Sequence, residues 1–227
     1  MGLLLDLGYV VAALLTLPWF LYRITELGDW RCIQQRLGTG LPPPATGSIW
    51  LHGSSAGEVS LLQPLVQRLE VDFPGTSLVI TTFSSTGFET ARKVYSKHRV
   101  LFFPVDLSFV VHRFLRRFDP QLVIIVESDF WPNFLFAVQS KNIPIAVLNG
   151  KISNRSYQFH SKTRLIPMLL RRVQIIAAQN EEHASRFLKL GVSSECMKIT
   201  GNMKYDLVSI SDQDETIQGL RERFGYT

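Results

Sequence analysis

Cysteine and charge are both scarce in this chain of 227 residues. Its two cysteines, Cys32 and Cys196, lie far apart and in no metal-binding or redox spacing. This argues against a disulfide scaffold or a structural zinc site and favours a reducing compartment. Charged residues make up 19% of the chain and hydrophobic residues 46%, a composition that excludes a disordered protein. The chain is long enough for one sizeable domain with its own core and an appendage.

Several familiar signatures are also missing. The sequence has no Gly-x-Gly-x-x-Gly dinucleotide fingerprint and no Gly-Lys-Ser/Thr phosphate-binding loop. The histidines His52, His112 and His160 show no ligand spacing, so a metal site is not expected. No recognised nucleic-acid-binding motif is present, so nucleic acid is not the expected partner.

Positive charge is in slight excess, with a net charge of +5 and a pI near 9.4. This excess allows an anionic partner without identifying it. Arg113, Arg116 and Arg117 share one side of a predicted helix, and Arg171 and Arg172 end another. Such clusters are usually solvated faces, but beside a bilayer they could bind anionic headgroups or the phosphates of a lipid substrate.

The N-terminus carries a long apolar run, Leu3–Tyr22, interrupted only by Asp6 and Thr16. As a helix it would reach across roughly 30 Å of hydrocarbon. No basic residue precedes the run and three follow it: Arg23, Arg31 and Arg36. The positive-inside rule therefore places the remainder of the chain in the cytoplasm. We predict a membrane anchor over residues 1–24, spanning or embedded in one leaflet. A buried core helix is the alternative, because Asp6 and Pro18 weaken a full span.

The rest of the chain divides into three predicted segments. Residues 25–47 form an amphipathic segment and a linker, in which prolines and glycines break regular structure. Residues 48–206 form the main domain. Residues 207–227 are a polar interdomain linker or truncated tail, with the start of a helix at Glu215–Phe224.

Within 48–206, short apolar runs alternate with segments of helical periodicity, which is typical of βαβ units and a parallel sheet. The predicted strands are 48–54, 77–83, 100–105, 122–126, 144–148, 174–178 and 197–200. The predicted helices lie near 58–72, 86–97, 108–118, 131–141, 160–172 and 181–190. We therefore predict a parallel α/β domain. In such sheets ligands bind beyond the carboxyl ends of the strands, so the loops after the strands are the candidate site.

The first of these loops, Gly53-Ser-Ser-Ala-Gly-Glu58, joins small residues to a carboxylate. Small residues such as Gly57 let a ligand approach the backbone, and the N–H groups that begin the next helix favour an anion. Glu58 stands at that helix start, where it could accept a proton from an attacking hydroxyl. The alternative is that Glu58 is only a favourable first-turn residue.

A second carboxylate, Glu127, follows a hydrophobic strand and should face the same edge of the sheet as Glu58. Two such carboxylates could divide acid and base roles, or one could orient the partners of the other. Asp129 is a candidate cap for the helix that begins at Trp131 and Pro132. Capping and packing are the alternative role for this loop.

Two further loops suit an anion. Lys151 and Arg155 lie beside hydroxyl donors in the segment 149–156, and could hold a phosphate or carboxylate. The turn 82–87 is rich in hydroxyls and leads into a helix. An ordinary capping turn is the alternative there.

Together these loops resemble one family, from the apolar N-terminal segment to about residue 206. The matching motifs are Trp50-Leu-His52 with Ser55-Ala-Gly-Glu58, Thr81-Thr-Phe-Ser-Ser-Thr-Gly87, Pro104-Val-Asp106, Glu127-Ser-Asp-Phe-Trp-Pro-Asn133, Asn149 with Ser153 to Ser156, Ala178-Gln179, Arg186-Phe187 with Leu190-Gly191, and Gly201-Asn-Met-Lys-Tyr-Asp206. They resemble the N-terminal half of 3-deoxy-D-manno-octulosonic acid (Kdo) transferases, membrane-associated glycosyltransferases of lipopolysaccharide core assembly.

The resemblance implies a GT-B fold with two Rossmann-like domains and a site in the cleft between them. It implies an inverting transfer of Kdo from CMP-Kdo to a lipid A precursor, without metal or cofactor, at the cytoplasmic face of a bacterial inner membrane reached by a single N-terminal anchor. Glu58 matches the family's proposed general base, and Glu127 matches the other acid of the cleft. The residues expected to bind substrate are Ser55, Gly57, Thr82, Ser85, Thr86, Gly87, Asn133, Asn149, Lys151, Ser153, Arg155 and Lys204.

The chain departs from the family in some residues and in length. Aspartate stands at 129 where the family has glutamate, and Lys151 replaces a typical arginine, whose bidentate contact a lysine cannot make. Family members are much longer, so the chain is expected to hold the acceptor-side half without most of the donor site, and to be inactive or partly active alone. It would be a fragment, a truncated product or half of a split enzyme. Two alternatives stay open: a non-catalytic membrane-tethered module that binds anionic lipid, and a related GT-B transferase of another acidic sugar.

Overall fold

A computed structural model describes residues 5–8 and 30–207 of the chain. Within these residues no helix is both long and apolar enough to cross a membrane. Most of the apolar run 3–22, on which the predicted anchor depends, lies outside the described residues, as does the predicted tail beyond residue 207. The described residues 5–8 are helical, and Asp6 accepts hydrogen bonds from Ser108 N, at 2.9 Å, and from Ser108 Oγ.

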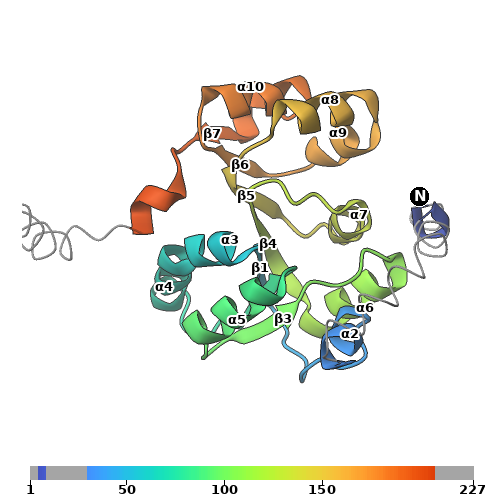
Figure 1. The fold of residues 1–227 in the computed structure, drawn as a ribbon, viewed down its shortest axis with the longest axis vertical. Helices are drawn as coiled ribbons and strands as arrows, with labels where there is room; N and C mark the ends of the chain where they lie inside the picture. The colour runs from blue at the N-terminus through green and yellow to red at the C-terminus, as the bar shows by residue number, and fades with distance from the viewer. Residues whose placement is uncertain (1–4, 9–29, 208–227) are drawn as a thin grey trace, which may run out of the picture.

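The domain is built on one parallel sheet of seven strands (Figure 1). These are β1 (Ser48–His52), β2 (Leu78–Thr82), β3 (Arg99–Phe102), β4 (Pro120–Val126), β5 (Ile145–Gly150), β6 (Ile175–Ala178) and β7 (Met197–Ile199). Their order across the sheet is β3-β2-β1-β4-β5-β6-β7. Each predicted strand is present. Its ends lie within two residues of the predicted ones, except that β3 ends at Phe102, three residues before the predicted end at 105. The parallel Rossmann-like α/β fold is confirmed.

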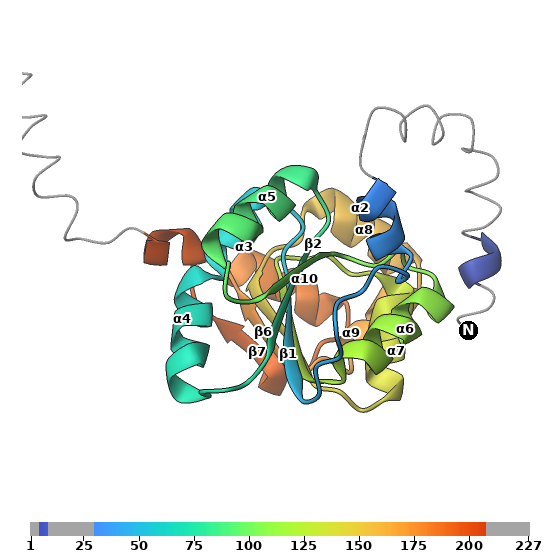
Figure 2. The same cartoon turned by 90° about the horizontal axis from the view of Figure 1, so that it is seen from below.

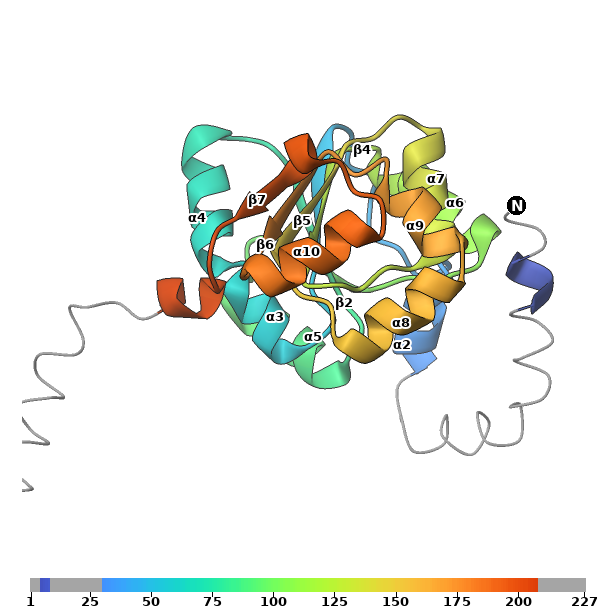
Figure 3. The ribbon, with the colours of Figure 1, turned by 90° about the horizontal axis from the view of Figure 1, so that it is seen from above.

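Helices cover both faces of the sheet. They are α2 (Trp30–Arg36), α3 (Ala56–Leu61), α4 (Gln63–Asp72), α5 (Ser85–Val94), α6 (Ser108–Phe118), α7 (Pro132–Ser140), α8 (Asn154–Lys162), α9 (Leu165–Leu170) and α10 (Glu181–Lys189), with the 3₁₀ turns η1 (Ser194–Cys196) and η2 (Met203–Leu207). The helices α3, α4 and α5 bury their apolar sides on one face, and α6, α7 and α9 on the other (Figure 2). Near the end of the sheet, α10 packs on β6 and β7 (Figure 3).

Strands β1 and β2 are buried throughout, because helices cover them from both sides. This is expected for continuous apolar runs such as Leu78-Val-Ile, which are typical of strands covered on both faces. Trp50 on β1 anchors an aromatic cluster with Phe114 and Phe134, at ring-centroid distances of 5.8 and 5.0 Å. The indole N–H of Trp50 donates to Thr81 Oγ1 at 2.8 Å, so its one polar atom is satisfied inside the core.

Prolines divide two predicted helices. The segment predicted as one helix over 58–72 is two, α3 and α4, with Pro64 in the first turn of the second. The segment predicted near 160–172 is likewise divided before α9, in whose first turn Pro167 stands. Proline has no N–H to donate, and its ring clashes with the carbonyl four residues earlier, so a helix must restart there.

One stretch predicted as a loop is helical. The helix α8 begins at Asn154, because Ser153 caps it by accepting a hydrogen bond from Ser156 N at 3.1 Å. Arg155 therefore projects from the first turn of a helix that buries none of its residues.

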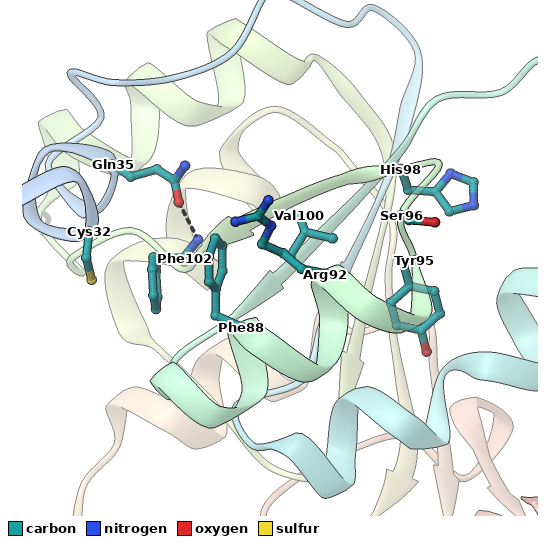
Figure 4. Close-up of a pocket in the computed structure, with 9 residues that line it drawn as sticks. All are labelled: Cys32, Gln35, Phe88, Arg92, Tyr95, Ser96, His98, Val100 and Phe102. Atoms are coloured by element: carbon teal, nitrogen blue, oxygen red, sulfur yellow. Dashed lines mark hydrogen bonds between the residues drawn. The ribbon is translucent and has the colours of Figure 1, made fainter. Parts of the chain in front are cut away.

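Strand β3 forms one edge of the sheet, and helix α2 partly covers it. The side chain of Gln35 accepts a hydrogen bond from Phe102 N at 2.9 Å (Figure 4). A cavity of about 510 Å³ lies beside this edge, lined by residues of α2, α5 and β3 such as Cys32, Arg92 and Val100. None of the residues that line it belongs to the predicted site.

Candidate active site at the reversal of strand order

The point where the strand order reverses lies between β1 and β4. From β1 the chain builds the sheet outward to β2 and β3, and it then returns to place β4 on the other side of β1. The loops after β1 and β4 therefore diverge, and in sheets of this kind ligands bind at such a point, beyond the carboxyl ends of the strands. Glu58 follows β1, and both Glu127 and Asp129 follow β4.

Glu58 is the third residue of α3 and takes part in the capping of that helix. Ser55 is the N-cap and accepts a hydrogen bond from Glu58 N at 3.3 Å. In return, the carboxylate of Glu58 accepts from Ser54 N and from Ser55 Oγ, both at 2.9 Å. The arrangement is reciprocal like a capping box, except that the backbone N–H bound by Glu58 belongs to Ser54, one residue before the N-cap. The bonds hold the carboxylate beside the loop after β1 and occupy one acceptor position on each oxygen.

The surroundings of Glu58 favour its protonated form. Burial raises the pKa of this carboxyl most, and the negative charges of Glu127 and Asp129 raise it further. The hydrogen bonds from Ser54 and Ser55 oppose this shift without cancelling it, so the pKa lies above its ordinary value. A raised pKa makes the ionised carboxylate a stronger base.

Asp129 is not the cap of α7, contrary to expectation. Its Oδ2 lies 2.8 Å from His52 Nε2 and also accepts a hydrogen bond from Ser54 Oγ. Burial raises the pKa of Asp129, but the hydrogen bonds and charge of His52, with the bond from Ser54, outweigh burial and lower it below its ordinary value. Asp129 is therefore an ionised group that joins the loop after β4 to the loop after β1.

The cap of α7 comes from another loop. Asp106, after β3, accepts hydrogen bonds from Asn133 N at 3.0 Å and from Phe134 N at 2.7 Å. The side-chain amide of Asn133 donates to Asp106 O at 2.7 Å and to Asp6 Oδ1 at 2.9 Å. Asn133, predicted to bind substrate, is thus 1% exposed and engaged in holding α7 to its neighbours.

Glu127 and Lys151 form an ion pair across the ends of β4 and β5. Lys151 Nζ lies 2.6 Å from Glu127 Oε2, and the Glu127 side chain is 12% exposed against 44% for Lys151. Glu127 has a φ of 65°, in the left-handed region that costs a residue with a side chain about 1–2 kcal/mol. Strain of this kind is typical of functional sites.

Asn149, near the end of β5, is fully buried and also has a positive φ, 54°. Its Oδ1 accepts a hydrogen bond from Met203 N at 3.1 Å, and its backbone carbonyl accepts one from Gln179 Nε2 at 3.2 Å. The side-chain Nδ2 has no hydrogen-bond partner among the described residues. Asn149 therefore joins η2 to the sheet and has one buried donor left over, which a ligand atom could satisfy.

The hydroxyl-rich turn after β2 packs directly on the loop after β1. Thr82 Oγ1 donates to Ser54 O at 3.0 Å, and Ser84 caps α5 by accepting from Gly87 N at 3.0 Å. A Cβ at Gly87 would lie 2.9 Å from Ser84 Oγ and 3.2 Å from the carbonyl carbon of Ser55, so only glycine allows this approach. Ser85 and Thr86, predicted to bind substrate, are exposed at the N-terminus of α5.

The remaining predicted residues lie farther out. Ser153 serves as the cap of α8, while Arg155 and Lys204 are solvent-exposed on α8 and η2. The structure thus brings together Glu58, Ser55, Thr82 and Gly87 on one side, and Glu127 with Lys151 on the other. The sequence reasoning missed His52 and Ser54, although His52 ends a strand beside the predicted loop and this position could have suggested a role.

The comparisons with known proteins begin with the fold. Solved structures of UDP-N-acetylglucosamine 2-epimerases share it: that of Neisseria meningitidis superposes with a TM-score of 0.54 at 14% identity, over 78% of this chain and 52% of that one. That of Rickettsia bellii gives 0.54 at 12% identity, over 80% and 52%. The protein is therefore a Rossmann-like domain of the kind that makes up one half of these larger sugar-nucleotide enzymes.

The sequence narrows this class to one family. Residues 31–207 match the family model described as 3-deoxy-D-manno-octulosonic-acid transferase (kdotransferase), and the chain belongs to this glycosyltransferase family as its N-terminal domain. The transferase of Haemophilus influenzae is 34% identical over 81% of this chain and 43% of its own length. That of Chlamydia trachomatis serovar D is 36% identical over 69% and 37%. The chain thus spans less than half of these two relatives.

Proposed function

We propose that the chain is the acceptor-side half of an inverting, metal-independent transferase that moves Kdo from CMP-Kdo to a lipid A precursor, with Glu58 as the general base. Membership of the family supports the class of reaction. The placement of Glu58 supports its role, because its carboxylate is fixed near the reversal of strand order with an acceptor position left on each oxygen. A C-terminal nucleotide-binding domain would supply most of the donor site.

In the proposed step, the ionised carboxylate of Glu58 takes the proton of the acceptor sugar hydroxyl. The hydroxyl oxygen forms its bond to the anomeric carbon of Kdo while the bond to the CMP phosphate breaks, and CMP leaves with that electron pair. Glu127 stands on the opposite side of the reversal point, where its negative charge supports the oxocarbenium-like charge that develops on the sugar. Lys151, paired with Glu127, is placed to meet an anionic group of a substrate.

The test is a transfer assay with CMP-Kdo and lipid A precursor, with a C-terminal half from a family member fused after Thr227 or supplied in trans. Glu58→Gln keeps the size of the side chain and removes its basicity, so turnover should fall by about 100-fold or more. Ser85→Ala, an exposed hydroxyl of the neighbouring turn, should reduce affinity for substrate more than turnover. Full activity of Glu58→Gln in a fusion that is active as wild type would refute the assignment of the base.

Association with a bilayer is the second proposed property, through the anchor expected at residues 1–24 and a basic surface on α6. Arg113, Arg116 and Arg117 line a groove of about 350 Å³. Arg113 and Arg117 donate to backbone carbonyls of the segment 37–42, which is a packing role and explains part of the cluster without lipid. Flotation of residues 30–227 with anionic and with neutral vesicles distinguishes lipid binding from packing. Greater recovery with anionic vesicles would support lipid binding, and equal recovery with the two kinds of vesicle would leave packing as the role of these arginines.

A further inference from the structure

A continuous chain of polar contacts runs from the core of the sheet to Glu58. Thr81 on β2 contacts His52, His52 contacts Asp129, Asp129 contacts Ser54, and Ser54 contacts Glu58. These residues come from β1, β2 and the loops after β1 and β4, so the contacts cross the reversal point where the site lies.

At the inner end of this series of contacts, His52 is held in place from several directions. His52 is fully buried, and its ring packs on Phe103 at a centroid distance of 4.1 Å. Its Nδ1 lies 3.1 Å from Thr81 O and 3.0 Å from Thr81 Oγ1. Its Nε2 faces the Asp129 carboxylate, which can only accept, so Nε2 carries the hydrogen whatever the state of Nδ1. Two strands of the core therefore fix the direction in which His52 holds Asp129.

The outer end depends on Ser54, all of whose polar groups are engaged. Ser54 Oγ donates to the same Asp129 oxygen that His52 binds, and Ser54 O accepts from Ser84 N at 2.9 Å and from Thr82 Oγ1 at 3.0 Å. Ser54 N is then aimed at Glu58 Oε2 at 2.9 Å. The position of the Glu58 carboxylate follows from that of Ser54, which Asp129 holds from the side.

We propose that His52, Asp129 and Ser54 are positioning residues that fix the carboxylate of Glu58 and keep a second negative charge beside it. This inference rests on the proposed role of Glu58 as base and adds what sets that base in place. None of the three donates or receives a proton in the reaction. Their effect on turnover passes through the geometry and the proton affinity of Glu58.

The charges around Glu58 agree with this role. Burial is the largest cause of the raised pKa of Glu58, and Glu127 and Asp129 raise it through their charge. Glu127 is paired with Lys151, and Asp129 is bonded to His52, so each of the two acids has a partner of its own. Removing the charge of Asp129 while keeping its shape should therefore lower the pKa of Glu58.

Asp129→Asn is the matched substitution, because its Oδ1 can still accept from His52 Nε2 and Ser54 Oγ. We expect the pKa of Glu58 to fall in this variant, measured by carboxyl-carbon NMR titration of the 227-residue chain in mild detergent, with the Glu58 signal assigned by its loss in Glu58→Gln. Ser54→Ala cuts the link to Asp129 but keeps the N–H that binds Glu58. In the fusion assay its kcat should fall by ~10- to 100-fold with KM for the acceptor within about twofold. Asp129→Glu should retain more activity than Asp129→Ala.

The outcomes separate this proposal from the one on which it rests. An unchanged Glu58 titration in Asp129→Asn together with unchanged kcat in Ser54→Ala would overturn the positioning role, even if Glu58→Gln were inactive. A lowered Glu58 pKa in Asp129→Asn alongside an active Glu58→Gln would support the positioning role of Asp129. The same result would refute the assignment of Glu58 as the general base. If Asp129→Asn fails to fold, the kcat of Ser54→Ala tests the positioning role alone, because this variant retains all backbone contacts of Ser54. An unchanged kcat would then refute the positioning role.

Discussion

Lys151 Nζ and Glu127 Oε2 lie 2.6 Å apart, although the two residues follow different strands and were predicted for different tasks. The lysine was expected to hold an anion and the glutamate to assist the reaction. Their contact means that the positive charge offered to a substrate also neutralises the carboxylate of Glu127. An anionic ligand must compete with Glu127 for Lys151, or share it.

Substitution of Lys151 should lower the stability of the protein, because it leaves the buried carboxylate of Glu127 without its cation. In Lys151→Met the Glu127 carboxylate stays largely buried without its cation, so unfolding free energy in urea should fall by about 1 kcal/mol, a modest value because the lysine is partly exposed. The double variant Lys151→Met/Glu127→Gln should recover most of the loss. Additive losses in this cycle would contradict a coupled pair.

The stability of the Glu58 variants should depend on pH in a defined direction. A carboxyl whose pKa is raised on folding contributes stability that is fully present below its unfolded pKa and lost as pH rises through the folded value. The stability of Glu58→Gln relative to wild type should therefore be greater at pH 7 than below about pH 4, where the wild-type carboxyl is protonated. Denaturant titrations at several pH values measure it.

Glu58→Ala provides the matched control for the same position. It removes the charge as Glu58→Gln does, but leaves both Ser54 N and Ser55 Oγ without an acceptor, whereas the one side-chain oxygen of glutamine still serves one of them. Its unfolding free energy should lie about 1 kcal/mol below that of Glu58→Gln. Equal stabilities would mean that the capping bonds contribute nothing measurable.

Two glycines of the site should respond in opposite ways to alanine. Gly87→Ala would place a methyl group against Thr82 Oγ1 and the backbone of Ser55, so the turn after β2 must move away from the loop after β1. We expect a loss of about 1–3 kcal/mol and of activity. Gly57→Ala meets nothing closer than 4.0 Å within a helix, so it should be neutral or stabilise by about 0.5–1 kcal/mol. A drop in acceptor affinity in Gly57→Ala with intact stability would indicate that a ligand approaches the backbone there.

The cap of α7 offers a prediction outside the reaction. Asp106→Ala removes the acceptor of both Asn133 N and Phe134 N, and should lower the unfolding free energy by about 1–2 kcal/mol. Asn133→Ala should share most of this loss, with little change in KM if its amide serves only Asp106 and Asp6. A large rise in KM without loss of stability would return Asn133 to the substrate-binding residues.

The alternation of apolar runs and segments of helical periodicity was enough to predict the sheet. A strand covered on both faces, such as residues 122–126, must be an almost continuous apolar run, and such a run is easily recognised in the sequence. The same alternation was enough also to place Glu58 and Glu127 on one rim, since parallel strands bring their carboxyl ends together. Both predictions depend on patterns within about ten residues of chain.

The side-chain partners could not be predicted in the same way. Asp129 stands before a helix and looks like its cap, yet Asp106 performs that task from a loop distant in sequence, and Asp129 binds His52 instead. A choice between two acids depends on the distance from each to the helix start, which no local pattern encodes. The break before α9 could have been predicted from the sequence, because Pro167 is a local signal that a helix restarts.

The amide of Gln35, bonded to Phe102 N, bears on the solubility of the protein. A sheet with two free edges offers each copy a place to add strands of another, and so to aggregate. Here a single side chain occupies a donor of the β3 edge, and the β7 edge is only the three residues Met197–Ile199. Replacement of Gln35 would leave every residue of the proposed active site intact and still make the protein harder to keep in solution.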